Sequence, residues 1–272
     1  MVKKYDIGFI KAVASGNDFV MLDDLDGRLG ARKLDYPALA REICPRRTSV
    51  GADGLIVLEP SKKADIRMRI INPDGSEAAM CGNGARASAL YAARKLKKDR
   101  LTIETGAGLL DAGIKGDTVK LRMSDPREMK LNLDIKIGDT VLKGHYVNTG
   151  VPHVVVIVED IEKFLVNEVG RRIRHHVLFT PAGTNADFVG DIKDNGASIR
   201  TYERGVEDET LACGTGSTAS AVILGMLRRV SSPVKMKTRG GEVLTIYFKI
   251  DKDKVTDVYL EGACSIVFEG KI

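Results

Sequence analysis

Two segments of this chain repeat nearly the same sequence around a cysteine. Cys81 lies within AMCGNGARASA (Ala79–Ala89), and Cys213, 132 positions later, lies within LACGTGSTASA (Leu211–Ala221). Each cysteine precedes Gly-x-Gly and a series of small residues. Each is therefore expected at the start of a helix, where backbone N–H groups favour negative charge. A chain with such a repeat is expected to fold as two copies of one unit.

Further matches recur at almost the same spacing. They are Gly16–Leu22 with Gly150–Val156, Gly51–Asp53 with Asn185–Asp187, Ile66–Arg67 with Ile199–Arg200, and Thr105–Gly106 with Thr238–Gly240. Two copies are too few for a solenoid, which needs at least three repeats. We therefore predict an internal duplication that gives two pseudo-symmetric halves.

Hydrophobic periodicity predicts an α+β fold, in which each half is a curved, mainly antiparallel sheet wrapped around a central helix. The central helices are expected near 83–97 and 215–228, and the second is apolar nearly all round, which is typical of a buried helix. Two more helices are expected near 35–45 and 161–174. Strands are expected at 6–13, 19–22, 55–59, 66–71, 101–105, 118–122, 154–158, 187–189, 199–202, 234–238, 243–250, 255–261 and 265–268.

The predicted domain organisation follows from the repeat. The N-terminal half is expected to span residues 1–123 and to be joined by residues 264–272, and the C-terminal half to span 124–263. The boundary lies in the Ser124-Asp125-Pro126 loop. The active site is expected in the cleft between the halves.

Composition excludes several classes of protein. With 43% hydrophobic and 29% charged residues the chain is globular, and no stretch approaches 18 uncharged apolar residues, so no membrane association is expected. The net charge of +5 is spread along the chain and aromatic residues make up 5%, which argues against nucleic-acid binding. Met1–Asp6 lacks a signal-peptide core, and a cytoplasmic protein is expected.

Cysteine usage favours thiol chemistry over a metal or disulfide site. The four cysteines, Cys44, Cys81, Cys213 and Cys264, include no C-x-x-C pair, so neither a zinc site nor a disulfide framework is expected. Cys44 and Cys264 lie in apolar or helical surroundings and are expected to be inert core thiols.

Two thiols at helix N-termini suit proton transfer at carbon. A thiol in that position can have its pKa lowered to about 3.5–7.5. Exposed N–H groups after Gly82 and Gly214 could hold a carboxylate. One thiol on each face of the carbon beside that carboxylate could remove a proton and return another, which inverts the carbon without a cofactor.

The same glycines also fit G-x-G-x-x-A, the dinucleotide-binding fingerprint. That fingerprint must follow a hydrophobic strand directly. Here the preceding segments, Pro73–Glu77 and Gly205–Glu209, are acidic turns. A nucleotide site is therefore not expected.

The chain resembles the diaminopimelate epimerase family over nearly its whole length. The motifs that carry the resemblance are SGNDF (15–19), VGADG (50–54), NPDGSE (72–77), MCGNGAR (80–86), GVPH (150–153), GTN (183–185), YERG (202–205) and ACGTG (212–216). The resemblance implies a cofactor-independent isomerase that interconverts LL- and meso-diaminopimelate in lysine and cell-wall precursor synthesis. It also implies a homodimer with a small amino-acid substrate and no metal.

The resemblance also implies roles for individual residues. Cys81 would be the thiolate that attacks the LL substrate, and Cys213 the proton donor on the opposite face. The backbone of Gly82-Asn83 and Gly214-Thr215 would hold the α-carboxylate, and Glu203 the α-amino group. The distal carboxylate and amino group would be bound by Asn17, Asn72, Asn185 and Arg204, and His153 would tune the thiols.

Two departures and two alternatives remain. Many members carry asparagine at the position of Val151, and some carry glutamine at that of Gly54, so one amide contact to the distal group is expected to be missing here. One alternative is a racemase of proline, hydroxyproline or another amino acid, although proline-type members carry histidine where Asn83 stands. The other is a ligand-binding or scaffold protein with idle thiols. His145, His175 and His176 are expected at the surface.

Overall fold

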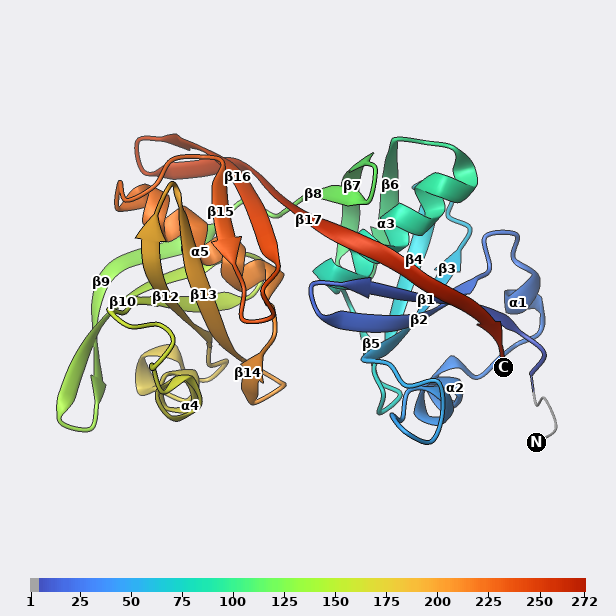
Figure 1. Ribbon diagram of the computed structural model, residues 1–272, viewed down its shortest axis with the longest axis horizontal. Coiled ribbons are helices and arrows are strands. Elements are labelled where there is room, and N and C mark those ends of the chain that lie inside the picture. The colour runs from blue at the N-terminus through green and yellow to red at the C-terminus, as the bar shows by residue number, and fades with distance from the viewer. Residues whose placement is uncertain (1–4) are drawn as a thin grey trace. The chain divides into compact units, whose positions relative to one another are not determined.

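The computed structural model describes residues 5–272, so the start of the segment examined for a signal peptide, Met1–Lys4, lies outside the described residues. The chain divides into two compact units: the residues up to Leu121 together with Gly262–Ile272, and Arg122–Glu261. It is an α+β fold, rich in sheet and with few helices (Figure 1). Among the described residues, none of the helices has the length and apolar character needed to span a bilayer.

Eight strands of the first unit form a ring around α3 (Gly82–Leu96). The order is β17–β1–β2–β3–β4–β6–β7–β8, and β8 pairs again with β17. The pairs β2–β3 and β4–β6 are parallel, and the other pairs with a defined register are antiparallel. The strands are β1 (Gly8–Ala14), β2 (Asn17–Asp23), β3 (Gly54–Glu59), β4 (Ile66–Ile71), β6 (Arg100–Thr105), β7 (Gly108–Lys115), β8 (Thr118–Arg122) and β17 (Lys254–Lys271).

The second unit contains a row of eight strands, β9–β10–β11–β12–β13–β15–β16–β17, with α5 (Gly214–Met226) packed against it. The pairs β11–β12 and β13–β15 are parallel and the others are antiparallel. The strands are β9 (Arg127–Ile137), β10 (Thr140–Asn148), β11 (Pro152–Ile157), β12 (Asn185–Lys193), β13 (Gly196–Glu203), β15 (Val234–Lys237) and β16 (Val243–Asp251), and the row ends on β17.

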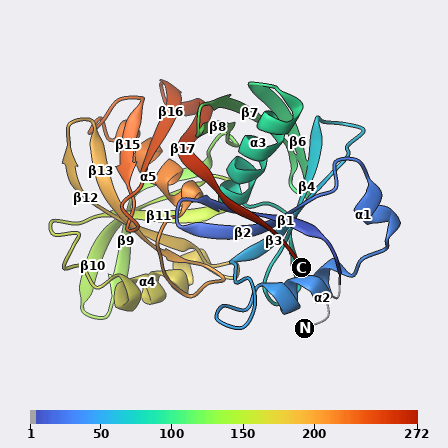
Figure 2. The same cartoon turned by 45° about the vertical axis from the view of Figure 1, so that its right-hand side comes forward.

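Two short strands lead into the central helices. β5 (Glu77–Ala78) pairs with β4 just before Cys81, and β14 (Asp208–Thr210) pairs with β13 just before Cys213. Both central helices are buried along most of their length because small residues let the surrounding strands approach closely. Figure 2 shows α3 among the strands of the first unit and α5 among those of the second. The central helices predicted near 83–97 and 215–228 are therefore present.

Outer helices complete each core. In the first unit, α2 (Tyr36–Ile43) begins at Asp35, whose carboxylate accepts the Ala38 N–H (3.0 Å), and packs its apolar face on the sheet; the short α1 (Arg28–Ala31) precedes it. In the second unit, α4 (Val166–Arg174) and the 3₁₀ turn Val177–Phe179 cover strands β12 and β13.

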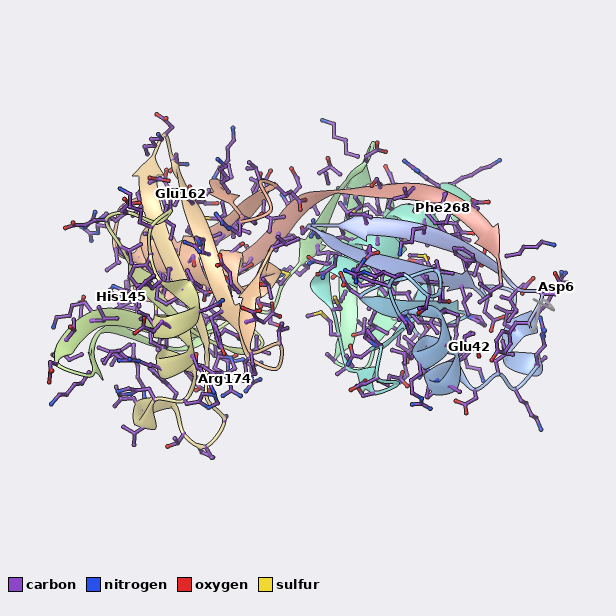
Figure 3. The ribbon with its side chains drawn as sticks, turned by 60° about the horizontal axis from the view of Figure 1, so that its bottom comes forward. Asp6, Glu42, His145, Glu162, Arg174 and Phe268 are labelled. Atoms are coloured by element: carbon purple, nitrogen blue, oxygen red, sulfur yellow. The ribbon has the colours of Figure 1, made fainter. Side chains whose placement is uncertain are left out.

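Several expectations need correction. α4 begins at Val166 and not near 161, β7 and β10 were not predicted, and the two expected strands at 255–261 and 265–268 form one long strand, β17. β17 contributes its first part to the second unit and its last part to the first, where Phe268 packs edge-on against Phe9 with ring centroids 5.9 Å apart (Figure 3). A length of 18 residues is far beyond an ordinary strand, which explains why two were expected.

Two further differences concern the second unit. β9 carries a period-two alternation of apolar residues (Met129, Leu131, Leu133, Ile135) that the prediction omitted. His145, expected at the surface, is 5% exposed, and its Nδ1 accepts the Asn132 N–H at 3.2 Å (labelled in Figure 3). Burial lowers the pKa of His145. His145 is buried because its strand, β10, lies between β9 and β11. This burial was not expected, because it depends on pairing between separate strands.

Candidate active site

Cys81 is the N-cap of α3. Its backbone is extended (φ −141°, ψ 117°), and its Sγ accepts the N–H of Gly84 at 3.4 Å, as a serine oxygen does in an ordinary cap. The first N–H groups of a helix have no acceptor inside it, so the N–H groups of Gly82 and Asn83 remain available beside the sulfur. Cys81 and the N–H groups of Gly82 and Asn83 form the first half-site, which can hold an anion next to a thiol.

A chain of side-chain hydrogen bonds fixes the start of α3. Asn83 donates to Asn17 (2.7 Å), and Asn17 donates to the Asp53 carboxylate (3.0 Å). The guanidinium of Arg86, which is wholly buried, donates to Asn83 Oδ1 (2.7 Å) and to Ser15 Oγ. The structure therefore brings Cys81, Asn83 and Asn17 together. Both the oxygen and the nitrogen of the Asn17 side-chain amide are hydrogen-bonded to other side chains of the protein.

Asn72 lies in the loop after β4 and closes a turn. Its amide donates to Ser76 Oγ (2.9 Å), and its backbone N–H donates to the Ser76 carbonyl (2.8 Å). Asparagine commonly has this role in turns. The side chain is half-buried, so a ligand contact is compatible with the turn.

Cys213 is the N-cap of α5 with matching geometry. Its backbone is extended (φ −121°, ψ 114°), and its Sγ accepts the Gly216 N–H at 3.4 Å. Thr215 adds a hydroxyl 3.4 Å from the sulfur, and the Thr215 carbonyl accepts a hydrogen bond from Thr149 Oγ1 (3.1 Å). The N–H groups of Gly214 and Thr215 have no acceptor inside the helix.

The expectation that the helix N-terminus makes the Cys213 thiol acidic is wrong. Burial raises the pKa of Cys213 well above its usual value, and the nearby carboxylates of Glu203 and Asp187 raise it further. The hydrogen bonds from Thr215 and Gly216 act in the opposite direction but are smaller effects. Desolvation therefore outweighs these hydrogen bonds and favours the protonated form of the Cys213 thiol.

His153 forms a buried pair with a residue that the sequence analysis did not assign to the site. His153 Nδ1 lies 2.7 Å from Asp187 Oδ2, and both side chains are completely buried. The other carboxylate oxygen of Asp187 accepts the hydroxyl of Thr201 (2.8 Å). Asp187 could have been suspected from the repeat, because Gly51–Asp53 matches Asn185–Asp187.

Glu203 ends β13 and is only partly accessible. Burial raises the pKa of its carboxyl group, and the nearby Asp187 carboxylate acts in the same direction, whereas a hydrogen bond with Thr210 acts against them. Cys213, His153, Asp187 and Glu203 form the second half-site. Its two carboxyl groups, those of Asp187 and Glu203, suit it to bind a ligand cation.

Asn185 is a positioning residue for Arg204. Its amide donates to the Pro152 carbonyl (2.9 Å), and its Oδ1 accepts the backbone N–H of Arg204 (2.7 Å). The half-buried Arg204 guanidinium donates to the Ala182 carbonyl (3.2 Å) and retains other N–H groups for a carboxylate. Val151 is half-buried beside Pro152 and supplies no polar group at this end.

The remaining cysteines do not start helices: Cys44 ends α2, and Cys264 lies in β17. All four cysteines are within the described residues and none forms a disulfide. Cys44 is 2% exposed, and burial raises its pKa to about 11; Cys264 is 5% exposed. Across residues 5–272, histidine, cysteine and acidic side chains do not gather into a cluster of three suited to a metal ion.

Comparison with known proteins assigns the chain to a family. The family model described as diaminopimelate epimerase matches residues 9–129 and 145–267. A diaminopimelate epimerase of Aquifex aeolicus is 43% identical over 282 aligned positions, covering 97% of each chain. One of Archaeoglobus fulgidus is 39% identical and covers 97% of this chain and 95% of its own.

Solved structures share the fold at much lower identity. A phenazine biosynthesis protein of the PhzF family from Bacillus anthracis superposes with a TM-score of 0.73 at 20% identity, covering 98% of this chain and 99% of its own. A hydroxyproline epimerase from Agrobacterium vitis gives 0.68 at 17% identity, covering 100% and 92%. These structures support the fold alone; the full-length sequence matches carry the assignment. The chain belongs to the diaminopimelate epimerase family.

Proposed function

We propose that this chain is an isomerase that interconverts LL- and meso-diaminopimelate with two cysteines and no cofactor. Family membership over nearly the whole chain gives the substrate. The observation that carries the mechanism is the matched pair of caps, with Cys81 and Cys213 each starting a buried helix and each accepting an N–H at 3.4 Å.

In the LL-to-meso direction, the Cys81 thiolate removes the proton from the α-carbon and becomes a thiol. Cys213 delivers its proton to the opposite face of that carbon and becomes a thiolate. The carbon–hydrogen bond broken on one face is replaced by one formed on the other, and the roles exchange in the reverse reaction. The raised pKa of Cys213 suits it to be the protonated partner before this step.

The α-carboxylate is proposed to bind the N–H groups of Gly82, Asn83, Gly214 and Thr215, which have no acceptors within their helices. These donors also stabilise negative charge that spreads into the carboxylate when the α-proton leaves. The α-ammonium group is proposed to pair with Glu203. Its positive charge would offset the carboxylates that raise the pKa of Cys213, so substrate binding itself would make that thiol easier to ionise.

The distal end of the substrate is proposed to bind Arg204 and Asn72, with Asn17 and Asn185 contributing mainly by positioning. A guanidinium fork is well matched to a carboxylate. Asn185 holds the backbone of Arg204, and Asn17 holds Asn83, so loss of either would disturb a neighbour that faces the ligand. Hydrophobic Val151 leaves this end with fewer polar contacts than an asparagine would give.

We further propose that the two units arose by internal duplication and that the active site lies in the cleft between the predicted halves, 1–123 with 264–272 and 124–263. The succession of antiparallel and parallel pairs is the same along β17–β1–β2–β3–β4–β6–β7–β8 as along β9–β10–β11–β12–β13–β15–β16–β17, which supports a duplication. A cytoplasmic homodimer is the proposed form of the enzyme.

The test is a screen for hydrogen exchange at the α-carbon in deuterated water, with LL-diaminopimelate, proline and hydroxyproline as substrates. We expect deuterium in diaminopimelate and the appearance of its other stereoisomer, with no exchange in the prolines. Exchange confined to proline or hydroxyproline would favour the alternative racemase. Exchange in no amino acid, with both thiols intact, would favour a non-catalytic protein.

A further inference from the structure

We propose that Asp187 is a positioning residue that fixes the ring of His153 with its proton on Nδ1, so that Nε2 accepts a hydrogen bond from the α-ammonium group of the substrate. The inference rests on the proposed function for the identity of that ammonium group. Its geometric part lies wholly within the second unit.

Asp187 lies where three neighbouring strands meet the first turn of α5. It stands directly opposite Thr201 in the β12–β13 register, and His153 projects from β11, the parallel neighbour of β12. The Thr201 hydroxyl reaches Asp187 Oδ1 (2.8 Å) and His153 Nδ1 reaches Oδ2 (2.7 Å). Both carboxylate oxygens therefore have defined partners on adjacent strands.

The chemistry of the pair fixes the tautomer. An ionised carboxylate only accepts hydrogen bonds, so the short contact with His153 requires the ring to donate from Nδ1. A neutral imidazole has one N–H, and Nε2 is then left with a lone pair. A carboxylate behind a histidine is a common means of holding a ring in one orientation.

The outer nitrogen of the ring has no donor within residues 5–272. His153 Nε2 is buried and makes no hydrogen bond to any described residue. A buried acceptor without a donor costs free energy, which a ligand that supplies the donor recovers. Glu203 lies on the same face of β13 as Thr201, two positions along the strand, and Thr201 and His153 both contact Asp187, so a group that binds Glu203 is also near this ring. An ammonium group, with three N–H donors, can serve both acceptors.

Asp187 is also in contact with the turn that carries the thiol. A Cβ placed on Gly216 would lie 2.3 Å from Asp187 Oδ1, so the carboxylate occupies the space that a side chain there would need. The N–H of the same Gly216 donates to Cys213 Sγ (3.4 Å). Asp187 therefore sets the relative position of the His153 ring and the Cys213 cap.

The first measurement needs no activity. In the full chain with ¹⁵N-labelled histidine, with His153 assigned through a His153→Gln variant, the ring signals of the ligand-free protein are expected to report protonated Nδ1 and unprotonated Nε2. On saturation with diaminopimelate the Nε2 signal is expected to shift while Nδ1 stays protonated. Protonated Nε2 in the ligand-free protein, or an Nε2 signal unchanged on saturation, would overturn the proposal.

The second measurement uses Asp187→Asn, which preserves shape but offers the ring an amide donor as readily as an acceptor. We expect kcat/KM for diaminopimelate to fall about 10- to 100-fold, the size of a lost hydrogen bond to a charged group, and the ring to populate both tautomers. The matched control is Asp24→Asn in the first unit. Asp24 is 1% exposed and accepts the N–H groups of Leu29 (2.6 Å) and Gly30 (2.8 Å).

Both substitutions remove charge from a buried carboxylate that accepts two hydrogen bonds, so both are expected to lower Tm. Only Asp187→Asn is expected to lower kcat/KM by more than about threefold. Equal kcat/KM in the two variants would contradict the proposal. If Asp187→Asn does not fold, the tautomer of the His153 ring measured in the unaltered chain still tests the proposal. Absence of epimerase activity in the unaltered chain would refute the proposed function. The tautomer measurement would then still test whether Asp187 fixes the His153 ring.

Discussion

The amide of Asn83 donates a hydrogen bond to Asn17 Oδ1 over 2.7 Å, so two residues expected to meet the substrate are bonded to each other. Asn17 in turn donates to Asp53, which is held by Arg46 (2.7 Å). The start of α3, where Cys81 lies, is thereby connected to the starts of β2 and β3. Residues that look like ligand contacts in the sequence thus also hold the helix start in place.

Replacement of Asn17 by alanine is expected to lower kcat/KM about 10- to 100-fold. The change removes the acceptor of Asn83 and the donor to Asp53, so the second residue of α3 loses its orientation, and the unfolding free energy is expected to fall by about 1–2 kcal/mol. The control is Asn195→Ala, which removes an amide bonded to the carbonyls of Ser231 and Pro233 (both 2.7 Å). Steady-state kinetics and denaturant unfolding should show a similar stability loss in both variants and a kinetic loss only in Asn17→Ala; comparable kinetics would contradict the role of Asn17.

Stability at alkaline pH should depend on Cys44. Its pKa in the folded protein is about 11, against an ordinary value of 9.0 for an exposed thiol, so the unfolded chain ionises this thiol first as pH rises. The folded state then holds more protons, and the stabilisation present below pH 9 is lost between about pH 9 and 11. A pKa difference of this size corresponds to at most about 2.7 kcal/mol. Denaturant unfolding from pH 8 to 11 should give a steeper decline for the unaltered chain than for Cys44→Ala; parallel curves would argue against a perturbed thiol.

Gly216→Ala is expected to reduce kcat/KM at least tenfold. Its Cβ would meet Asp187 Oδ1 at 2.3 Å, so either the carboxylate or the first turn of α5 must move, and the Cys213 cap moves with it. Gly113→Ala in β7 is the control, because no atom lies within 4 Å of a Cβ there. Kinetics that are equally unaffected in both variants would mean that the packing of Asp187 against α5 has no catalytic role.

The sequence was sufficient to predict what local patterns determine. Cys81 and Cys213 start the two central helices as expected, because the cap and the small residues after it are contiguous in the chain. The pairing of His153 with Asp187 was not predicted, because it depends on the register between β11 and β12, which joins residues 34 positions apart. The direction of the Cys213 pKa shift was also wrong, because burial and the approach of Glu203 arise only in the folded chain.

The proposed mechanism requires the two sulfurs to face one carbon, and therefore each other when the site is empty. Mild oxidation of the ligand-free protein is expected to join Cys81 to Cys213 and abolish activity, and a dithiol reductant is expected to restore it. Peptide mapping by mass spectrometry identifies the link. Diaminopimelate added before the oxidant should slow the reaction. Full activity after oxidation, with Cys81 and Cys213 still reduced, would contradict their proximity.

The most direct test of the two-thiol account is the rate of epimerisation in Cys81→Ala and Cys213→Ala, measured from LL- and from meso-diaminopimelate. Cys264→Ala is the control, since that residue is a buried thiol of β17 that caps no helix. We predict that each of the first two variants loses at least about 1000-fold in kcat in both directions, because inversion needs a proton acceptor on one face and a donor on the other. The control should retain activity within about threefold. Turnover that persists in either Cys81→Ala or Cys213→Ala would contradict the account.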